Sequence, residues 1–272
     1  MKQGFIFFCE IIDIIIITDT IIIGGYMIEL IGNKIFLENG LEIREYDTEE
    51  GVVRALISCE SIQSLIYMDK EKRQKLCFEY FNYFNIPIHL NPNGVDYLML
   101  GGGGISYPHY YLNKYKDKNL DIVEIDRNNI DIAKRYFYLG ELIENNYERL
   151  NIIIDDAIKY ISYTNKKYDY ILIDLFNGKE PIKEIYNEEN IINLRKILKE
   201  NGTIVINYII TNNYNKEEIN KIIQITDKYK IITNQKYFDI INNIGNIIIL
   251  LSNNEINIPY NYNYIDITYK VV

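Results

Sequence analysis

The hydrophobic and polar positions along this chain alternate in two different ways. Between residues 27 and 69, short segments alternate apolar and polar residues and are separated by turn residues such as Asn39-Gly40. This pattern predicts a small antiparallel sheet. From residue 95 onward, short continuous apolar runs alternate with helical stretches. Continuous apolar runs are typical of parallel strands buried on both faces, and their strict alternation with helices predicts an α/β doubly wound sheet.

The boundaries of these elements follow from breaker residues. A helix is expected near 74–84, after which Pro87 and the Asn-Pro-Asn-Gly segment at 91–94 interrupt the chain. The main domain begins there, with strands expected at 95–100, 120–125, 149–154, 168–174 and 202–209. The intervening helices are expected to about 115 and at 128–139, 156–162 and 189–200. A helix is expected at 216–229. Strands are expected around 230–237 and 246–252, where they would close the sheet as an antiparallel pair. We therefore expect three regions: 1–26, a small β-region with a helix at 27–90, and the main α/β domain at 91–272.

The first 26 residues are apolar enough to resemble a membrane span. Glu10, Asp13 and Asp19 interrupt the run, and each would cost roughly 2.5 to 3.5 kcal/mol at the centre of a bilayer helix. A signal peptide also fits poorly, because only Lys2 supplies positive charge. We expect that Met27 begins the functional chain, and that residues 1–26 are a non-native leader or an extra strand.

Charge and cysteine usage exclude several classes of protein. The 272 residues carry 29 Lys and Arg against 38 Asp and Glu, a net charge of −9, which argues against a nucleic acid partner. Cys9, Cys59 and Cys77 are far apart and show no metal-binding spacing, which indicates a reducing, cytoplasmic setting. With only His89 and His109 available, we expect no metal centre.

Four consecutive glycines, Gly101, Gly102, Gly103 and Gly104, lie between the first strand of the main domain and its helix. An open α/β sheet binds nucleotide-like ligands at this point, where glycine lets the backbone approach the ligand closely. The dinucleotide pattern would require a third glycine at position 107, where this chain has Tyr107. The alternative is a glycine turn that merely closes the corner between strand and helix.

Carboxylates follow the next two strands. Glu124, about 20 residues after the glycines, is placed to accept hydrogen bonds from two ribose hydroxyls, and Asp126 lies on the same face of the strand. Capping of the following helix is an equal alternative for Asp126. Asp155, Asp156 and Ala157 follow the third strand, where Asp156 is placed to accept from an adenine amino group. For Asp156 the alternative is again a helix cap, and Asp155 competes for the same role.

The fourth strand ends in Asp174, which faces the same predicted crevice. A carboxylate there could hold or deprotonate an amine nucleophile. The alternative is a solvated loop acid.

Several segments together resemble one known group. Residues 100–115, 121–137, 150–161, 168–176 and 202–209 resemble, in order and spacing, the spermidine synthase-like branch of class I S-adenosylmethionine-dependent transferases. The resemblance covers roughly residues 50–210. It implies a Rossmann-like, seven-stranded, mostly parallel sheet with a small N-terminal β-domain, and a possible homodimer. It also implies that Gly101 and Gly103 line the methionine part of the cofactor, Glu124 the ribose and Asp156 the adenine, with Asp174 at the catalytic edge.

Two departures from the pattern of aminopropyltransferases bear on the reaction. Those enzymes carry an aspartate that grips the aminopropyl ammonium where this chain has Gly104, and a second aspartate where it has Asn177. Each lost carboxylate removes charge-assisted hydrogen bonds worth about 1.5 to 3 kcal/mol. We therefore expect a methyltransferase that uses S-adenosylmethionine and a small-molecule or cationic acceptor such as an amine, with no nucleic acid or membrane partner. One alternative is an aminopropyltransferase that uses decarboxylated S-adenosylmethionine; another is a catalytically silent binding or scaffold protein.

Overall fold

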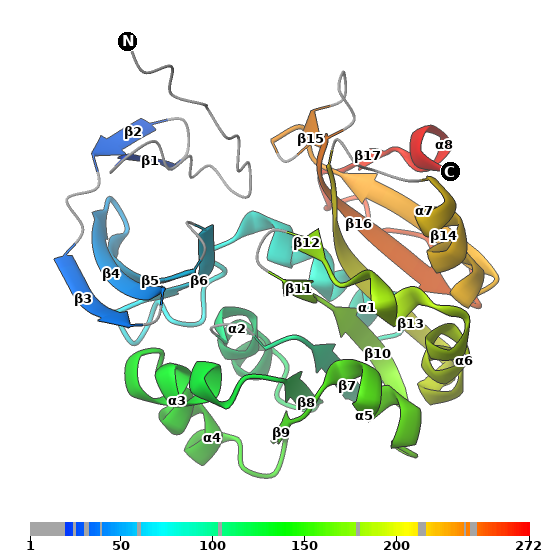
Figure 1. Cartoon of the computed structure of the whole chain (residues 1–272), viewed down its shortest axis with the longest axis horizontal. Coiled ribbons are helices and arrows are strands. Elements are labelled where there is room, and N and C mark those ends of the chain that lie inside the picture. Colours follow the sequence, from blue (N-terminus) through cyan, green and yellow to red (C-terminus); the bar gives the residue numbers. More distant parts are fainter. Residues whose placement is uncertain are drawn as a thin grey trace.

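The computed structural model of the chain (Figure 1) describes residues 20–23, 26–29, 33–38, 40–58, 61–102, 105–177, 180–211, 216–236, 238–239 and 244–272. Among these residues, no helix has the length and hydropathy required to cross a bilayer.

The N-terminal part is antiparallel, as the period-two pattern predicts. Four strands pair in chain order: β3 (Asn33–Glu38), β4 (Leu41–Thr48), β5 (Gly51–Ser58) and β6 (Ser61–Tyr67). Their inward side chains, among them Ile43, Ala55 and Leu65, are buried. A separate hairpin joins β1 (Thr20–Ile23) to β2 (Tyr26–Glu29). A strand therefore does occur within 1–26, while residues 1–19 lie outside the described residues and the start at Met27 stays a prediction.

The segment between the two sheets differs from the expected helix at 74–84. It forms a short 3₁₀ helix, η1 (Glu79–Asn85), followed by α1 (Ile86–Leu90). Pro87, which the sequence predicts as a breaker, lies in the first turn of α1. Proline is tolerated there because the first N–H groups of a helix have no intrahelical partner, so Pro87 begins a helix instead of ending one.

The main domain is a mixed, mostly parallel sheet flanked by helices, which confirms the Rossmann-like α/β prediction. Five strands are parallel: β7 (Asp96–Leu100), β8 (Asn119–Glu124), β9 (Leu150–Ile154), β10 (Tyr168–Ile173) and β13 (Leu198–Ile210). The expected closing pair is β14 (Lys228–Thr233) and β16 (Ile244–Ser252), which are antiparallel to each other. Within the described residues, the sheet has nine strands instead of the expected seven, because two short strands, β15 (Phe238–Asp239) and β17 (Ile265–Asp266), are added to it.

Helices connect these strands and cover both faces of the sheet (Figure 1). They are α2 (Ser106–Lys114), α3 (Arg127–Tyr136), α4 (Leu139–Asn145), α5 (Ala157–Tyr163), η2 (Lys183–Tyr186), α6 (Glu188–Ile197), α7 (Lys216–Ile222), η3 (Ile223–Ile225) and α8 (Thr268–Val271). After β10, two strands of two residues each, β11 (Phe176–Asn177) and β12 (Glu180–Pro181), pair as an antiparallel hairpin.

Strand alternation builds a separate core on each face of the sheet. On β7, Tyr97 and Met99 join the core that includes the aromatic residues of η1 and α2, whereas Leu98 and Leu100 join the core beneath α5 and α6. Both faces of the strand are therefore buried, which explains its continuous apolar run.

The order of strands is β9-β8-β7-β10-β13-β16-β14 along the sheet. The chain proceeds in one direction from β7 to β9 and in the other from β10 to β13, so the order reverses between β7 and β10. Ligands of open α/β sheets bind beyond the carboxyl ends of the strands at such a reversal. Gly101 and Gly102 after β7, and Asp174 after β10, lie at this point.

Candidate active site

The turn after β7 requires glycine at position 101. Gly101 has φ +91°, and a Cβ atom there would lie 2.2 Å from the backbone oxygen of Asp174. The Gly101 N–H donates to the Val123 carbonyl at 3.0 Å, and the Asp174 N–H donates to the Leu100 carbonyl at 2.9 Å. The turn is thus held between β8 and β10, and its backbone touches the start of the loop that carries Asp174.

Glu124 fastens the same turn from β8. Its Oε2 accepts from the Gly102 N–H at 3.0 Å, and its Oε1 accepts from the Asp126 N–H at 3.0 Å and from Asn129 Nδ2 at 3.3 Å. The side chain is only 6% exposed, so its carboxylate is oriented by protein donors. Gly103 and Gly104 lie outside the described residues. The structure therefore places Glu124 beside the glycine turn, and its contact with a ribose stays a prediction.

The three aspartates after β8 and β9 serve local structure. Asp126 caps α3 by accepting from the Asn128 N–H at 2.8 Å, and Asp156 caps α5 by accepting from the Ile158 N–H at 2.7 Å. Asp155 accepts from the Tyr163 hydroxyl at 2.8 Å and from the Asp156 N–H at 2.9 Å. The capping alternative thus describes both Asp126 and Asp156.

Ala157 is the buried first residue of α5. The cofactor contacts expected of Asp126, Asp155, Asp156 and Ala157 stay predictions, since the geometry accounts for the aspartates as caps and loop contacts.

Asp174 has a different environment from the capping aspartates. Asn207 Nδ2 donates to its Oδ1 at 2.9 Å. Burial raises the pKa of Asp174 to about 6, against the opposing effect of the Asn207 hydrogen bond. The side chain is partly buried and its pKa is raised, unlike that of a solvated loop acid, while its catalytic role stays a prediction. A carboxyl group with a pKa near 6 can both accept and release a proton close to neutral pH.

One side chain at this edge was not among the predicted site residues. Ile125, between Glu124 and Asp126, is 67% exposed, although it ends an otherwise buried apolar run. An exposed aliphatic side chain at the carboxyl end of β8 offers an apolar surface to a flat ring. The sequence carries the signal in the run 120–125, but only the structure shows that the last residue leaves the core.

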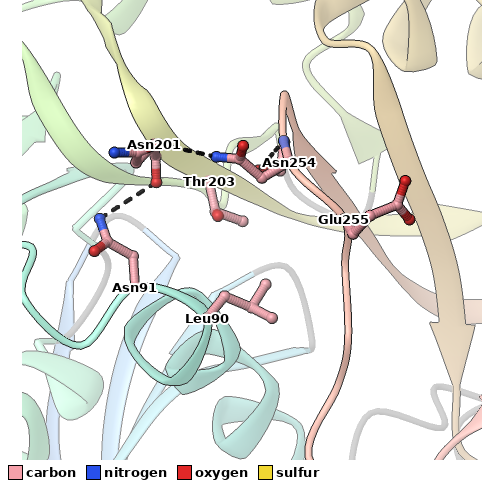
Figure 2. A pocket seen from close by; sticks show the side chains of 7 residues that line it. Leu90, Asn91, Asn201, Thr203, Asn254 and Glu255 are labelled. Carbon is pink, nitrogen blue, oxygen red and sulfur yellow. Dashed lines mark hydrogen bonds between the residues drawn. The ribbon is translucent and has the colours of Figure 1, made fainter.

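A cavity of about 210 Å³ lies at the opposite edge of the sheet (Figure 2). Its lining includes Asn91, which precedes β7, and Thr203 of β13, which pairs with Tyr170 near the amino end of β10. Asn91 Nδ2 donates to the Asn201 carbonyl at 3.3 Å, and Asn254 Nδ2 donates to Asn201 Oδ1 at 3.2 Å. The cavity is therefore separate from the candidate active site at the carboxyl ends of the strands. Within the described ranges, no group of three or more His, Cys, Asp or Glu side chains is arranged to hold a metal ion.

Comparison with known proteins shows which family this chain resembles. The family model of the spermine/spermidine synthase domain matches residues 81–258. The polyamine aminopropyltransferase of Methanocaldococcus jannaschii is 34% identical over 122 residues, which is 44% of this chain and 41% of that protein. The polyamine aminopropyltransferase of Vibrio vulnificus is 30% identical over 155 residues, or 56% of this chain and 50% of that protein. The matches thus span half or less of the length of these curated relatives.

Solved structures share the fold at low sequence identity. A probable spermidine synthase from Corynebacterium glutamicum superposes with a TM-score of 0.69 at 18% identity, covering 86% of this chain and 84% of that one. A spermidine synthase in complex with the transition state analogue AdoDATO superposes with a TM-score of 0.61 at 19% identity, covering 82% of this chain and 74% of that one. Human methyltransferase-like protein 13 in complex with SAH superposes with a TM-score of 0.57 at 17% identity, covering 68% of this chain and 86% of that one.

These findings correct the expectation of a methyltransferase, which is wrong. The curated relatives are named for aminopropyl transfer, and the likeness to the human methyltransferase-like protein is one of fold alone. The expectation gave too much weight to two positions, Gly104 and Asn177, whereas the order of motifs over the whole domain is the stronger signal. The resemblance stated from the sequence is confirmed: the chain belongs to the spermine/spermidine synthase domain family.

Proposed function

We propose that this protein is an aminopropyltransferase, which transfers the aminopropyl group of decarboxylated S-adenosylmethionine to an amine. The observation that carries the proposal is the partly buried carboxyl group of Asp174, held beside the glycine turn where the strand order reverses. The names of the curated relatives support the same reaction.

The reaction needs little covalent chemistry from the protein. The lone pair of the acceptor amine attacks the aminopropyl carbon bonded to the sulfonium, a C–N bond forms, and the C–S bond breaks with its electron pair going to sulfur. Methylthioadenosine leaves, and the new ammonium loses one proton. In this proposal the ionised Asp174 orients the amine before attack and accepts that proton. Its pKa of about 6 makes it ionised at neutral pH, as this role requires.

The nucleoside would lie along the ends of β7, β8 and β9. Glu124 is fixed by the Gly102 and Asp126 N–H groups, so its carboxylate is oriented in advance for ribose hydroxyls. Ile125 offers an exposed apolar surface for the adenine ring. Asp156 lies at the start of α5, one strand further along, where an adenine amino group could donate to it.

The acceptor is proposed as a small diamine or polyamine. A cationic substrate is favoured by the net charge of −9 and by the carboxylates at the ends of β8, β9 and β10. Asn177, which replaces a family aspartate, is exposed on β11 and could accept a hydrogen bond through its amide oxygen. An amide binds an ammonium group more weakly than a carboxylate does, so we expect a higher KM for diamines than in enzymes that carry the aspartate.

The test is turnover of labelled decarboxylated S-adenosylmethionine with putrescine, cadaverine and spermidine as separate acceptors. We expect release of methylthioadenosine and an aminopropylated product by mass spectrometry. Asp174→Asn should lower kcat about 100-fold or more, which is typical of loss of a general base. Asp131→Asn, on the exposed face of α3, is the matched control and should keep the wild-type rate.

Two outcomes contradict the proposal. Methyl transfer from S-adenosylmethionine without aminopropyl transfer would identify a different reaction. Binding of methylthioadenosine by calorimetry without turnover of any of the three amines would favour a catalytically silent binding protein. Ile125→Asp should weaken methylthioadenosine binding about tenfold or more, and unchanged binding would contradict the proposed place of the adenine.

A further inference from the structure

Two buried amide side chains lie behind Asp174. Asn207, on β13, is 4% exposed, and Asn246, on β16, is also 4% exposed. Ile173 pairs with Ile206 in the parallel register, so Asp174 follows β10 directly opposite Asn207. On the other side of β13, Asn207 pairs with Ile248, two residues from Asn246 on the same face of β16. Sheet register therefore brings the three side chains into one line.

Hydrogen bonds connect this line in one direction. Asn246 Nδ2 donates to Asn207 Oδ1 at 3.0 Å, and Asn207 Nδ2 donates to Asp174 Oδ1 at 2.9 Å. An ionised carboxylate can only accept, so Asn207 must present its NH₂ group to Asp174. The side-chain oxygen of Asn207 then points toward β16, where it accepts a hydrogen bond from the NH₂ group of Asn246. The donor from Asn246 thereby excludes the flipped orientation, in which the Asn207 oxygen would face the carboxylate.

The positions of these amides are costly for stability alone. Asn207 lies between the buried residues Ile206 and Tyr208, and Asn246 precedes the buried Ile247. Backbone groups already form the strand ladder, and burying a side-chain amide costs free energy that an aliphatic residue would not. This cost calls for an explanation other than packing.

We infer that Asn246 is a positioning residue, which holds the Asp174 carboxylate in its acceptor orientation through Asn207. Asn246 lies on the far side of β13 from Asp174. The inference rests on the proposed function, in which Asp174 receives a proton from the acceptor amine. The pair of amides keeps a donor on one carboxylate oxygen, which stabilises the ionised form that the reaction requires.

The surroundings of Asp174 supply other titratable groups. Tyr186 on η2 lies within electrostatic reach of Asp174, and Tyr208 on β13 and Glu218 on α7 act on the same phenol. Burial raises the pKa of Tyr186 well above its ordinary value, so this phenol stays neutral near pH 6. Glu218 is paired with Lys183 at 3.0 Å. A change at Asn246 leaves these groups in place.

Replacement of Asn246 by a residue without a donor tests the inference. In Asn246→Leu, Asn207 loses the partner that fixes its orientation, so the ionised form of Asp174 loses stabilisation. We expect the midpoint of the Asp174 titration to rise by about one pH unit, as a partly lost charge-assisted hydrogen bond implies. Carbon-13 labelling of aspartate carboxyl groups reports this midpoint, and the spectrum of Asp174→Asn assigns the signal. The acidic limb of the kcat/KM profile should move upward with it.

Thr233→Val is the matched control. Thr233 is 2% exposed on β14, and its hydroxyl donates at 2.7 Å to the backbone carbonyl of Asn246, not to its amide. This variant removes a buried hydrogen bond from the same residue without touching the line of amides. We expect lower stability but an unchanged Asp174 midpoint.

The outcomes separate this inference from the proposed function. An unchanged midpoint in folded Asn246→Leu, or an equal shift in Thr233→Val, overturns the positioning role even where the wild type transfers aminopropyl groups. Absence of turnover by the wild type contradicts the proposed function, while the carbon-13 titration still tests the link between Asn246 and Asp174. Asn246→Val, whose β-branched side chain favours strands and carries no donor, replaces the Leu variant where that variant does not fold.

Discussion

Aspartates at the ends of parallel strands have two different environments in this molecule, and the segment that follows each aspartate decides which one it has. Asp126 and Asp156 are each followed at once by a helix, so their carboxylates accept from free N–H groups of its first turn. Asp174 is followed by the hairpin of β11 and β12 and faces the amide of Asn207. Burial raises its pKa to about 6, which outweighs the lowering effect of the Asn207 hydrogen bond.

Asp174→Asn should therefore stabilise the fold while it lowers activity. The folded-state pKa is about 6, raised from the usual 3.8, so stability from this group is complete below pH 3.8 and is lost as pH rises through 6. The loss amounts to at most about 3 kcal/mol. The free energy of unfolding, measured with urea, should be higher for the variant than for the wild type at pH 7.5. The difference should vanish toward pH 4. A wild type that is equally stable or more stable at pH 7.5 contradicts this expectation.

At the scale of elements, β7, the turn that begins at Gly101, and α2 form the strand, turn and helix of the candidate site. Gly101 adopts φ +91°, a region that L side chains rarely enter, and its missing side chain lets the turn touch the Asp174 backbone. Ile105, just before α2, also has a positive φ of 70° and is buried. A β-branched residue is strained there, and burial of its side chain offsets the strain.

The substitutions Gly101→Ala and Gly140→Ala should have opposite effects. A Cβ at Gly101 would lie 2.2 Å from the Asp174 oxygen, so the turn must move, and we expect a loss of about 1 to 3 kcal/mol. At Gly140, inside α4, a Cβ meets nothing within 4 Å, so alanine should stabilise the helix by about 0.5 to 1 kcal/mol. Urea unfolding of both variants measures the contrast, and a Gly101→Ala protein as stable as the wild type is the contrary result.

For the molecule as a whole, the two sheets are joined at α2 and α3. The Ser106 hydroxyl donates to the Leu65 carbonyl at 2.6 Å, accepts from the Leu65 N–H at 3.1 Å, and contacts the hydroxyl of Ser64. Arg54, on β5, donates to the Tyr136 carbonyl at the end of α3 at 2.7 Å. Figure 1 shows β6 lying near α2 in this region. The N-terminal sheet thus holds the helix that follows the glycine turn.

Ser106→Ala should affect both stability and binding. The change leaves buried backbone groups of Leu65 without their side-chain partner, which costs about 1 to 3 kcal/mol. Because α2 follows the glycine turn, the affinity for methylthioadenosine should also fall severalfold. Urea unfolding and calorimetry measure the two effects. Ser162→Ala, on the exposed face of α5, is the control and should change neither, while a Ser106→Ala protein with wild-type values in both measurements argues against the coupling.

The order of the main elements could be read from the sequence because burial leaves a local pattern. Runs such as 97–100 and 170–173 are apolar throughout because both faces of their strands are covered. The contacts of Gly102 with Glu124 and of Gly101 with Asp174 also followed, since carboxyl ends of parallel strands share one edge of the sheet. Family membership was visible in the order of these motifs. The choice of methyl transfer was wrong because it weighted single residues, Gly104 and Asn177, above that order.

The contacts that give these residues their chemistry depend on tertiary structure. Asn207 and Asn246 are separated along the chain and meet Asp174 only through the register of β10, β13 and β16. Exposure of Ile125 at the end of a buried run is likewise visible only in the folded molecule. Periodicity records whether a residue is buried, since burial depends on the local face of a strand or helix. Partner identity depends on strand order and register, which distant segments set together, so only the folded molecule decided it.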